Sequence, residues 1–173
     1  MSGRETKHML QTICDACAAI EDIDGRPDGL DMSIQDLFIA DIQRFFLYMS
    51  ASDGAVAPKE RDYMNALFGV KLTIVDYAKL IKDTNIRNID FDEEIPLSLQ
   101  ILASFEANDD ESHKEIKKAY PDILSMAFDF YKKAGLEFIS CDKKVSTKEI
   151  EDLGLFLVRK KHILQELDQS ENK

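Results

Sequence analysis

Two short acidic segments hold the residues of this sequence that are best suited to chemistry. The first carries Asp53 and Glu60, and a shift of 89 positions leads to Asp142 and Glu149 in the second. Carboxylate oxygens are the preferred ligands of hard divalent cations such as Ca²⁺ and Mg²⁺. If the two segments pack together, these four carboxylates can share one cation, which makes them the candidate metal ligands of this chain.

Each segment also has a purely structural interpretation. The aspartates can accept hydrogen bonds from the backbone of a turn, and Glu60 and Glu149 stand near the third position of a following helix, where a carboxylate favours the positive end of the helix dipole. Val56 and Val145 would then close each turn with an apolar side chain. This arrangement requires no cation, so the cap and metal-ligand interpretations both stay open.

The first segment matches the EF-hand calcium loop at several offsets but lacks two of its ligands. Positions one and three of that loop fall on Met49 and Ala51 in the first segment and on Phe138 and Ser140 in the second, where carboxylates are needed. A self-sufficient EF-hand is therefore excluded. Lys143 stands where the first copy has glycine, which counts against equal use of the two segments in a shared site.

The residues around the two segments repeat as well, which predicts an internal duplication of helix, acidic turn and helix. Apolar residues agree at matching positions: Leu47 with Leu136, Met64 with Leu153, Leu67 with Phe156, and Phe68 with Leu157. We expect residues 1–173 to form a single compact all-α domain of about seven to eight helices with internally duplicated helical hairpins. Its halves would span about 33–84 and 96–167, after an N-terminal helix and loop over 1–32.

Hydrophobic periodicity and capping signals place the helices along the chain. We expect helices over about 5–22, 33–52, 58–69, 73–83 and 97–107, a short helix ending near 119, and long helices over about 121–139 and 146–167. The helix over 33–52 has a wide apolar stripe, which predicts a central position with neighbours on more than one side. Gly135 weakens one long helix locally, and the segment 85–94 is expected to be a linker.

Composition and charge exclude some classes of partner. The 33 acidic residues against 22 basic ones give a formal charge of −11, which repels phosphate backbones and anionic lipid, so we expect no nucleic-acid or membrane partner. No apolar stretch approaches the length of a spanning helix, and a cytoplasmic location follows as the default. Cys14 and Cys17 form a C-x-x-C inside a helical run without a second pair, so we expect two small buried hydrophobes.

The remaining polar clusters carry weaker predictions. His8, His113 and His162 are scattered along the chain and are expected to face solvent. Residues 24–29 are expected to form a solvated connector, and the basic cluster 159–162 would complement the C-terminal dipole of the last helix. Serine nucleophile elbows and glycine-rich phosphate loops are absent from the sequence.

Residues 46–61 resemble the first signature of the tellurite-resistance TerB-like family, with an apolar helix, an Asp-Gly turn and a Pro-x-Glu helix start. Residues 136–157 resemble the second signature of that family in degraded form. The resemblance implies an all-helical, internally duplicated domain, found also in the N-terminal part of certain J-domain co-chaperones. It further implies clustered acidic residues suspected of binding metal, and a role in stress or tellurite response without an established enzymatic activity.

These observations lead to one functional expectation and two alternatives. We expect a cytosolic, non-enzymatic domain that binds a divalent cation or a protein partner through the surface carrying the acidic turns. The first alternative is a metal-dependent hydrolase that uses the same carboxylates in a cleft. The second is a structural helical adaptor in which the acids only cap helices. The oligomeric state does not follow from the sequence.

Overall fold

The computed structural model describes residues 2–52, 55–85, 94–141 and 147–171, and every regular element in these ranges is helical. The elements are α1 (Ser2–Asp24), α2 (Ile34–Ser52), α3 (Pro58–Phe68), α4 (Ile74–Asp83), α5 (Leu97–Ala107), the 3-10 turn η2 (Glu111–His113), α6 (Lys114–Ala119), α7 (Ile123–Ser140) and α8 (Thr147–Glu171). The predicted all-α class is therefore confirmed. Within the described ranges, none of the helices has the length and apolar character needed to cross a membrane.

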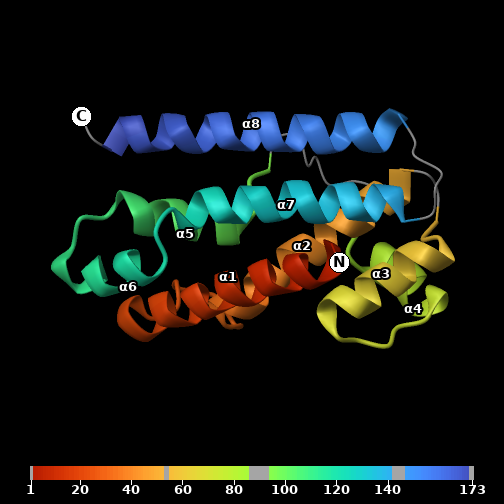
Figure 1. Ribbon diagram of the computed structural model, residues 1–173, viewed down its shortest axis with the longest axis horizontal. Coiled ribbons are helices and arrows are strands. Elements are labelled where there is room, and N and C mark those ends of the chain that lie inside the picture. The colour runs from red at the N-terminus through yellow and green to blue at the C-terminus, as the bar shows by residue number, and fades with distance from the viewer. Residues whose placement is uncertain (1, 53–54, 86–93, 142–146, 172–173) are drawn as a thin grey trace.

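The helices pack in layers around α2 and α7 (Figure 1). Helix α8 lies antiparallel along one side of α7, and α1 lies antiparallel along another. Helices α3 and α4 cover one end of the molecule, while α5, η2 and α6 lie at the other. Helix α2 contacts α1, α3, α4, α5, α7 and α8, so its predicted central position is confirmed.

The starts of several helices follow from local capping residues, as the sequence predicted. Ser33 accepts a hydrogen bond from the Asp36 backbone N–H at 3.0 Å and so caps α2. Thr73 and Asp76 form a reciprocal capping box at the start of α4. Helix α3 begins with Pro58 and ends at Gly69, whose left-handed φ of 68° suits a helix C-cap.

Two other helix starts are capped by carboxylates from a neighbouring helix. Glu21 of α1 accepts the backbone N–H of Ile34, in the first turn of α2, at 2.7 Å. Glu106 of α5 accepts the backbone N–H of Leu124, in the first turn of α7, at 2.8 Å. These bonds satisfy N–H groups that have no partner inside their own helix. They link consecutive or neighbouring helices through side chains that no local pattern identifies as caps.

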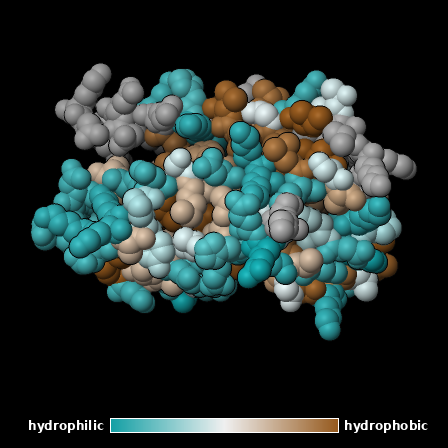
Figure 2. All heavy atoms as spheres, viewed as in Figure 1, coloured by the Kyte–Doolittle hydropathy of each residue, from teal (hydrophilic) through white to brown (hydrophobic). Residues whose placement is uncertain are grey.

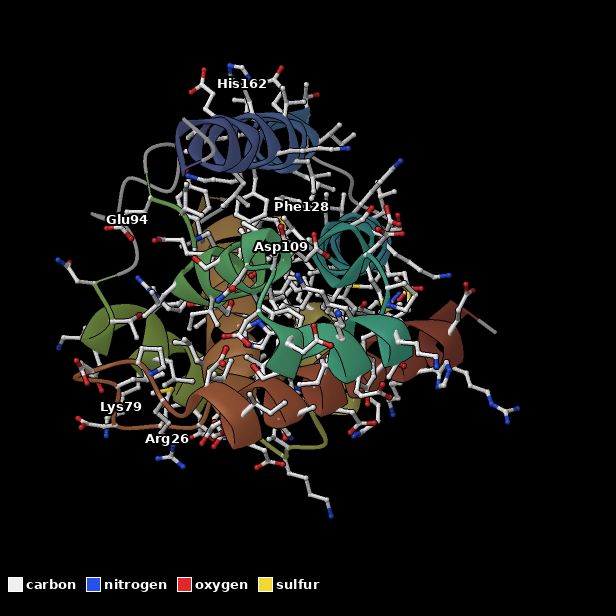
Figure 3. The ribbon with its side chains drawn as sticks, turned by 90° about the vertical axis from the view of Figure 1, so that its left-hand side faces the viewer. Arg26, Lys79, Glu94, Asp109, Phe128 and His162 are labelled. Carbon is white, nitrogen blue, oxygen red and sulfur yellow. The ribbon has the colours of Figure 1, made fainter. Side chains whose placement is uncertain are left out.

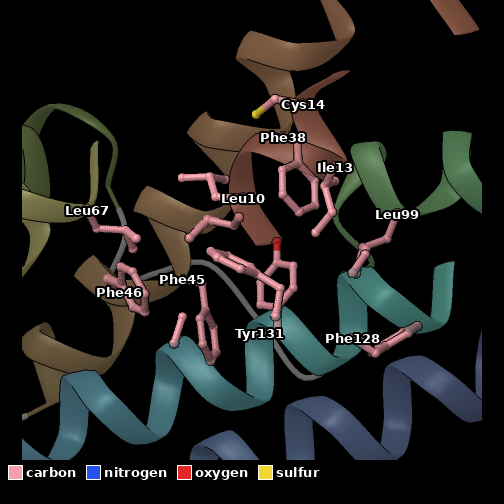
Figure 4. Close-up of a cluster of buried hydrophobic side chains, with 14 of the residues drawn as sticks. Leu10, Ile13, Cys14, Phe38, Phe45, Phe46, Leu67, Leu99, Phe128 and Tyr131 are labelled. Atoms are coloured by element: carbon pink, nitrogen blue, oxygen red, sulfur yellow. The ribbon is translucent and has the colours of Figure 1, made fainter. Parts of the chain in front are cut away.

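Aromatic side chains of α2 and α7 lie at the centre of the core, beside aliphatic side chains of α1, α3 and α5 (Figure 4). The rings of Phe46 and Phe138 stack with centroids 4.8 Å apart, and Phe45 meets Tyr131 edge-on at 5.4 Å. The ring centroid of Phe156 on α8 lies 4.5 Å from that of Phe45, so α8 also contributes to the aromatic cluster. Offset and edge-on ring pairs of this kind stabilise a core beyond the area that they bury.

Gly135 lets α8 approach α7 closely. A Cβ atom at this position would lie 2.7 Å from Cδ1 of Leu153 on α8, closer than unstrained atoms pack. The glycine that weakens the sequence prediction for this helix thus occupies a helix–helix contact.

Two of the residue pairs that align between the two sequence repeats, Met64 with Leu153 and Leu67 with Phe156, consist of buried residues.

The structure corrects several details of the prediction. Helix α7 begins at Ile123 rather than at residue 121, because Asp122 has a left-handed φ of 54° that cannot continue a right-handed helix. Helix α8 continues to Glu171, so the basic cluster 159–162 lies in its middle and not in its last turn.

Leu47 is 3% exposed whereas its aligned residue Leu136 is 47% exposed, because α7 has no helix packed over that side. The linker prediction for 85–94 falls mostly outside the described residues.

Asp41 of α2 is a buried cap for α5. Its Oδ2 accepts the backbone N–H of Ser98 at 3.0 Å and the hydroxyl of Ser98 at 2.6 Å. Burial raises the pKa of the Asp41 carboxyl, although the hydrogen bonds from Ser98 act in the opposite direction. Helix α5 starts with Pro96 and has no side-chain cap of its own, so Asp41 supplies the missing acceptor.

We expect Asp41→Ala to lower the free energy of unfolding by about 2 kcal/mol, because it leaves a buried N–H and a buried hydroxyl without an acceptor. Asp41→Asn keeps one acceptor oxygen and should cost less. Urea denaturation at neutral pH measures both variants. Equal losses for alanine and asparagine would contradict the capping role.

The same residue predicts a pH dependence. The raised pKa means that the folded state favours protonated Asp41, so its contribution to stability is full below the ordinary carboxyl pKa of about 4 and is lost as the pH rises through the raised value. Asparagine does not titrate. The unfolding free energy of the wild type relative to Asp41→Asn should therefore fall as the pH rises above about 4. If the difference in unfolding free energy between wild type and Asp41→Asn stays constant or rises with pH, the pKa of Asp41 is not raised by burial.

Candidate functional site

Glu60 is the one predicted metal ligand whose side chain lies among the described residues, and it is engaged as a helix cap. Its buried Oε2 accepts the backbone N–H of Ala57 at 2.7 Å and the hydroxyl of Ser50 at 3.2 Å. This geometry is the capping arrangement that the structural interpretation expected. Val56 beside it is buried, as predicted for an apolar residue that closes the turn.

The other three predicted ligands cannot be placed in the same way. Asp53 and Asp142 lie outside the described residues, and Glu149 belongs to the first turn of α8 with a side chain that is also outside them. The stacked rings of Phe46 and Phe138 do bring the last turns of α2 and α7 together, and these helices lead into the two acidic segments. Convergence of the four carboxylates stays a prediction.

Over the ranges that the structure describes, no group of three or more histidine, cysteine, aspartate or glutamate side chains is arranged to hold a metal ion. The hypothesis of a shared divalent cation therefore depends on Asp53, Asp142 and Glu149, whose side chains lie outside the described residues. Glu60 brings to it a carboxylate that already accepts two hydrogen bonds, one from the backbone of Ala57 before α3 and one from the hydroxyl of Ser50 on α2.

We expect Glu60→Ala to lower the free energy of unfolding by about 1–2 kcal/mol, because it removes an N-terminal capping carboxylate from α3. Glu60→Gln keeps an acceptor and should lose less. Urea denaturation of chelator-treated protein measures the effect. A loss that occurs only when a divalent cation is present would assign Glu60 to a metal site instead.

The matching test of the metal hypothesis is thermal unfolding with added calcium, magnesium, manganese or zinc. A cation that binds only the folded state stabilises it by about 2.7 kcal/mol at 100 times its dissociation constant. If the acids act only as caps, no cation raises the melting temperature. A rise that disappears in an Asp53→Ala, Asp142→Ala variant would establish the shared site.

His113 corrects the expectation that the histidines face solvent. It is 2% exposed, and its Nε2 lies 2.6 Å from Oδ1 of Asp24 at the end of α1. Its ring packs 4.8 Å from the ring of Phe105. Asp24, which was assigned to a solvated connector, instead joins α1 to η2. His8 and His162 are exposed, as predicted.

Cys14 and Cys17 are buried free thiols, as predicted. Burial, with smaller contributions from nearby acidic groups and from the other thiol, raises the pKa of Cys14 to about 11 and that of Cys17 to about 12. Metal binding and disulfide exchange both require the thiolate, which these values suppress near neutral pH. The C-x-x-C therefore serves packing of α1.

A groove between α5, α7 and α8 is one of the concave sites formed by the described residues. It encloses about 330 Å³ and is lined by Ala103, Glu106, Ala107, Leu124, Ser125, Phe128, Asp129, Lys161 and Leu164. Phe128 lies between α7 and α8 in two views (Figures 3 and 4). The volume is within the range of small-ligand and side-chain pockets.

The groove has an apolar floor and a charged rim. Leucine, phenylalanine and alanine side chains form the floor, and the ionisable groups of the rim are Glu106, Asp129 and Lys161. Glu106 is held in place because its Oε1 accepts the Leu124 N–H at the start of α7. Two carboxylates and one ammonium group give the rim a net negative charge. This charge favours a ligand in which a positively charged group stands next to an apolar one.

The sequence analysis did not identify this groove. Its residues come from three helices that are far apart in the chain, and only packing brings them together. One local signal existed: Ala103 and Ala107 place two small side chains one helical turn apart on the same face of α5. Small residues at this spacing leave room where larger ones would fill the contact.

A scan against models of known protein families found no match to this chain, and no curated protein or solved structure proved similar to it.

Proposed function

We propose that this chain is a cytosolic, non-enzymatic helical domain of TerB-like type that binds a protein partner through the groove between α5, α7 and α8. The partner segment would be basic and would insert one large apolar side chain over Phe128. The observation that carries this proposal is the cavity of about 330 Å³ with an apolar floor and two rim carboxylates.

Charge supports a basic partner segment at two levels. At the rim, Glu106 and Asp129 outnumber the single ammonium group of Lys161. Over the whole chain, the formal charge of −11 attracts positively charged segments and speeds their association. An apolar anchor in a desolvated pocket, surrounded by weaker charged contacts, is the usual way in which a small interface gains affinity.

The alternatives have less support from the described residues. A metal-dependent hydrolase needs carboxylates that converge with open coordination positions, and the buried Glu60 carboxylate is instead used to cap α3. A purely structural adaptor explains the caps but gives no account of an open apolar groove on a charged surface. Binding of a divalent cation by the acidic turns is a separate proposal, tested by the cation titration above.

We expect Ala103→Phe to block binding, because the larger side chain fills the groove from α5. Ala78→Phe is the matched control, since it makes the same change at an exposed alanine of α4. The probe is a lysine-rich amphipathic peptide with one phenylalanine, and its glutamate-rich counterpart tests charge. Fluorescence anisotropy should show binding of the basic peptide to the wild type and at least a tenfold weaker binding to Ala103→Phe.

Asp129→Lys should also weaken binding of the basic peptide, because it reverses one rim charge without filling the cavity. Equal affinity for the acidic and basic peptides would contradict the role of the rim. Equal loss in Ala103→Phe and Ala78→Phe would contradict the role of the groove. Circular dichroism melts of each variant verify that the fold is retained.

A further inference from the structure

Helix α8 has two apolar faces, and only one of them is covered within the molecule. Leu153, Phe156 and Leu164 are buried against the rest of the fold. On other sides of the same helix Ile150 is 51% exposed, Leu155 41% and Val158 71%. Figure 2 shows hydrophobic side chains gathered along the edge of the molecule formed by the middle of α8. Grouped apolar side chains on a surface mark sites of association.

Gly154 stands at the centre of the exposed face, between Ile150 and Val158 at one-turn spacing. A Cβ atom at this position would meet nothing within 4 Å, so no contact inside the molecule requires a glycine here. Gly135 differs, because Leu153 packs against it. A glycine inside a helix costs about 1 kcal/mol relative to alanine. An uncompensated glycine on an exposed apolar face suggests that another backbone approaches it.

We propose that this face binds a second copy of the chain, with the two α8 helices antiparallel and crossing at Gly154 on a two-fold axis. Ile150 precedes Gly154 by four residues and Val158 follows it by four. An antiparallel crossing at Gly154 therefore brings each Ile150 against the partner's Val158. The same surface serves both copies, as a closed two-fold interface requires.

Charges on the same face are also self-complementary. Glu151 and Lys161 are both exposed, and they lie before and after Gly154 in the chain. In the antiparallel arrangement Lys161 comes about four residues, or about 6 Å, along the axis from the partner's Glu151, within reach of a lysine side chain. Symmetry makes this pair occur twice. A single pair of helices forms a small interface, so we expect a reversible dimer that depends on concentration.

Disulfide trapping tests the geometry of the dimer. In a Cys141→Ser background, Gly154→Cys should cross-link to itself when diamide is added, because the two residues meet at the axis. Ile150→Cys should not cross-link to itself, because its two copies lie about 12 Å apart along the axis. A mixture of Ile150→Cys and Val158→Cys chains should cross-link to each other. Val75→Cys on α4, 77% exposed, measures random collision.

Sedimentation velocity tests the association itself. The wild type should show a dimer at high concentration, and Val158→Glu should weaken it at least tenfold. Val75→Glu, the same change at an exposed valine on α4, should leave it unchanged. Gly154→Leu should abolish the dimer while circular dichroism shows an intact fold, because the leucine has open space in the monomer but none at the crossing.

Two results would overturn the proposal. One is a wild type that stays monomeric at its highest soluble concentration. The other is self-cross-linking of Ile150→Cys: together with that of Gly154→Cys it describes a parallel arrangement, and without it an axis displaced from Gly154. Because Val158 does not line the groove, loss of the dimer in Val158→Glu with retained peptide binding separates this surface from the proposed docking site.

Discussion

The contact between α2 and α7 is the interaction on which the rest of this fold depends. Both helices place aromatic rings in it, and the stacked pair of Phe46 and Phe138 has centroids 4.8 Å apart and planes inclined by 13°. Phe45 and Tyr131 extend the contact toward Phe156 of α8. Helices α1, α3, α5 and α8 pack on both members of this pair, α4 packs on α2, and η2 and α6 pack mainly on α1. The groove arises at its margin, where α5 and α8 both pack on α7 and leave Phe128 between them.

A second constraint is the need to satisfy the backbone N–H groups that begin each helix. Six carboxylates do so within the described residues: Glu21, Asp41, Glu60, Asp76, Glu106 and, at the start of η2, Asp110. Part of the acidic excess of this chain is therefore structural. A carboxylate that accepts backbone N–H groups has fewer lone pairs for a cation, which is why clustered acids along a sequence do not by themselves define a metal site.

Helix α8 joins the two surfaces for which we propose binding. One side closes the groove with Leu164, another carries Ile150, Gly154 and Val158 away from the molecule, and the exposed Lys161 lies between these two sides. Most of its inward-facing residues are apolar, but Lys160 is also fully buried there. The helix thus has more apolar surface than its contacts with α2, α5 and α7 cover. Association with other chains is the simplest physical use of such a surface.

Local chemistry determined most of the secondary structure. Thr73 with Asp76, Pro58 with Gly69, and the wide apolar stripe of α2 each act over a few residues, so the sequence alone predicted the corresponding helices and the central place of α2. The burial of Cys14 and Cys17 followed from the same periodicity. These features depend on hydrogen bonds and side-chain spacing within one helix.

Tertiary structure decided which helix faces meet, and with them the candidate site. Glu106 reaches the start of α7, His113 is buried against Asp24, and Leu136 stays exposed although its aligned residue Leu47 is buried. The groove likewise draws its lining from α5, α7 and α8. Such contacts join residues that are distant in the chain, so their position depends on the packing of the whole core and not on any local pattern.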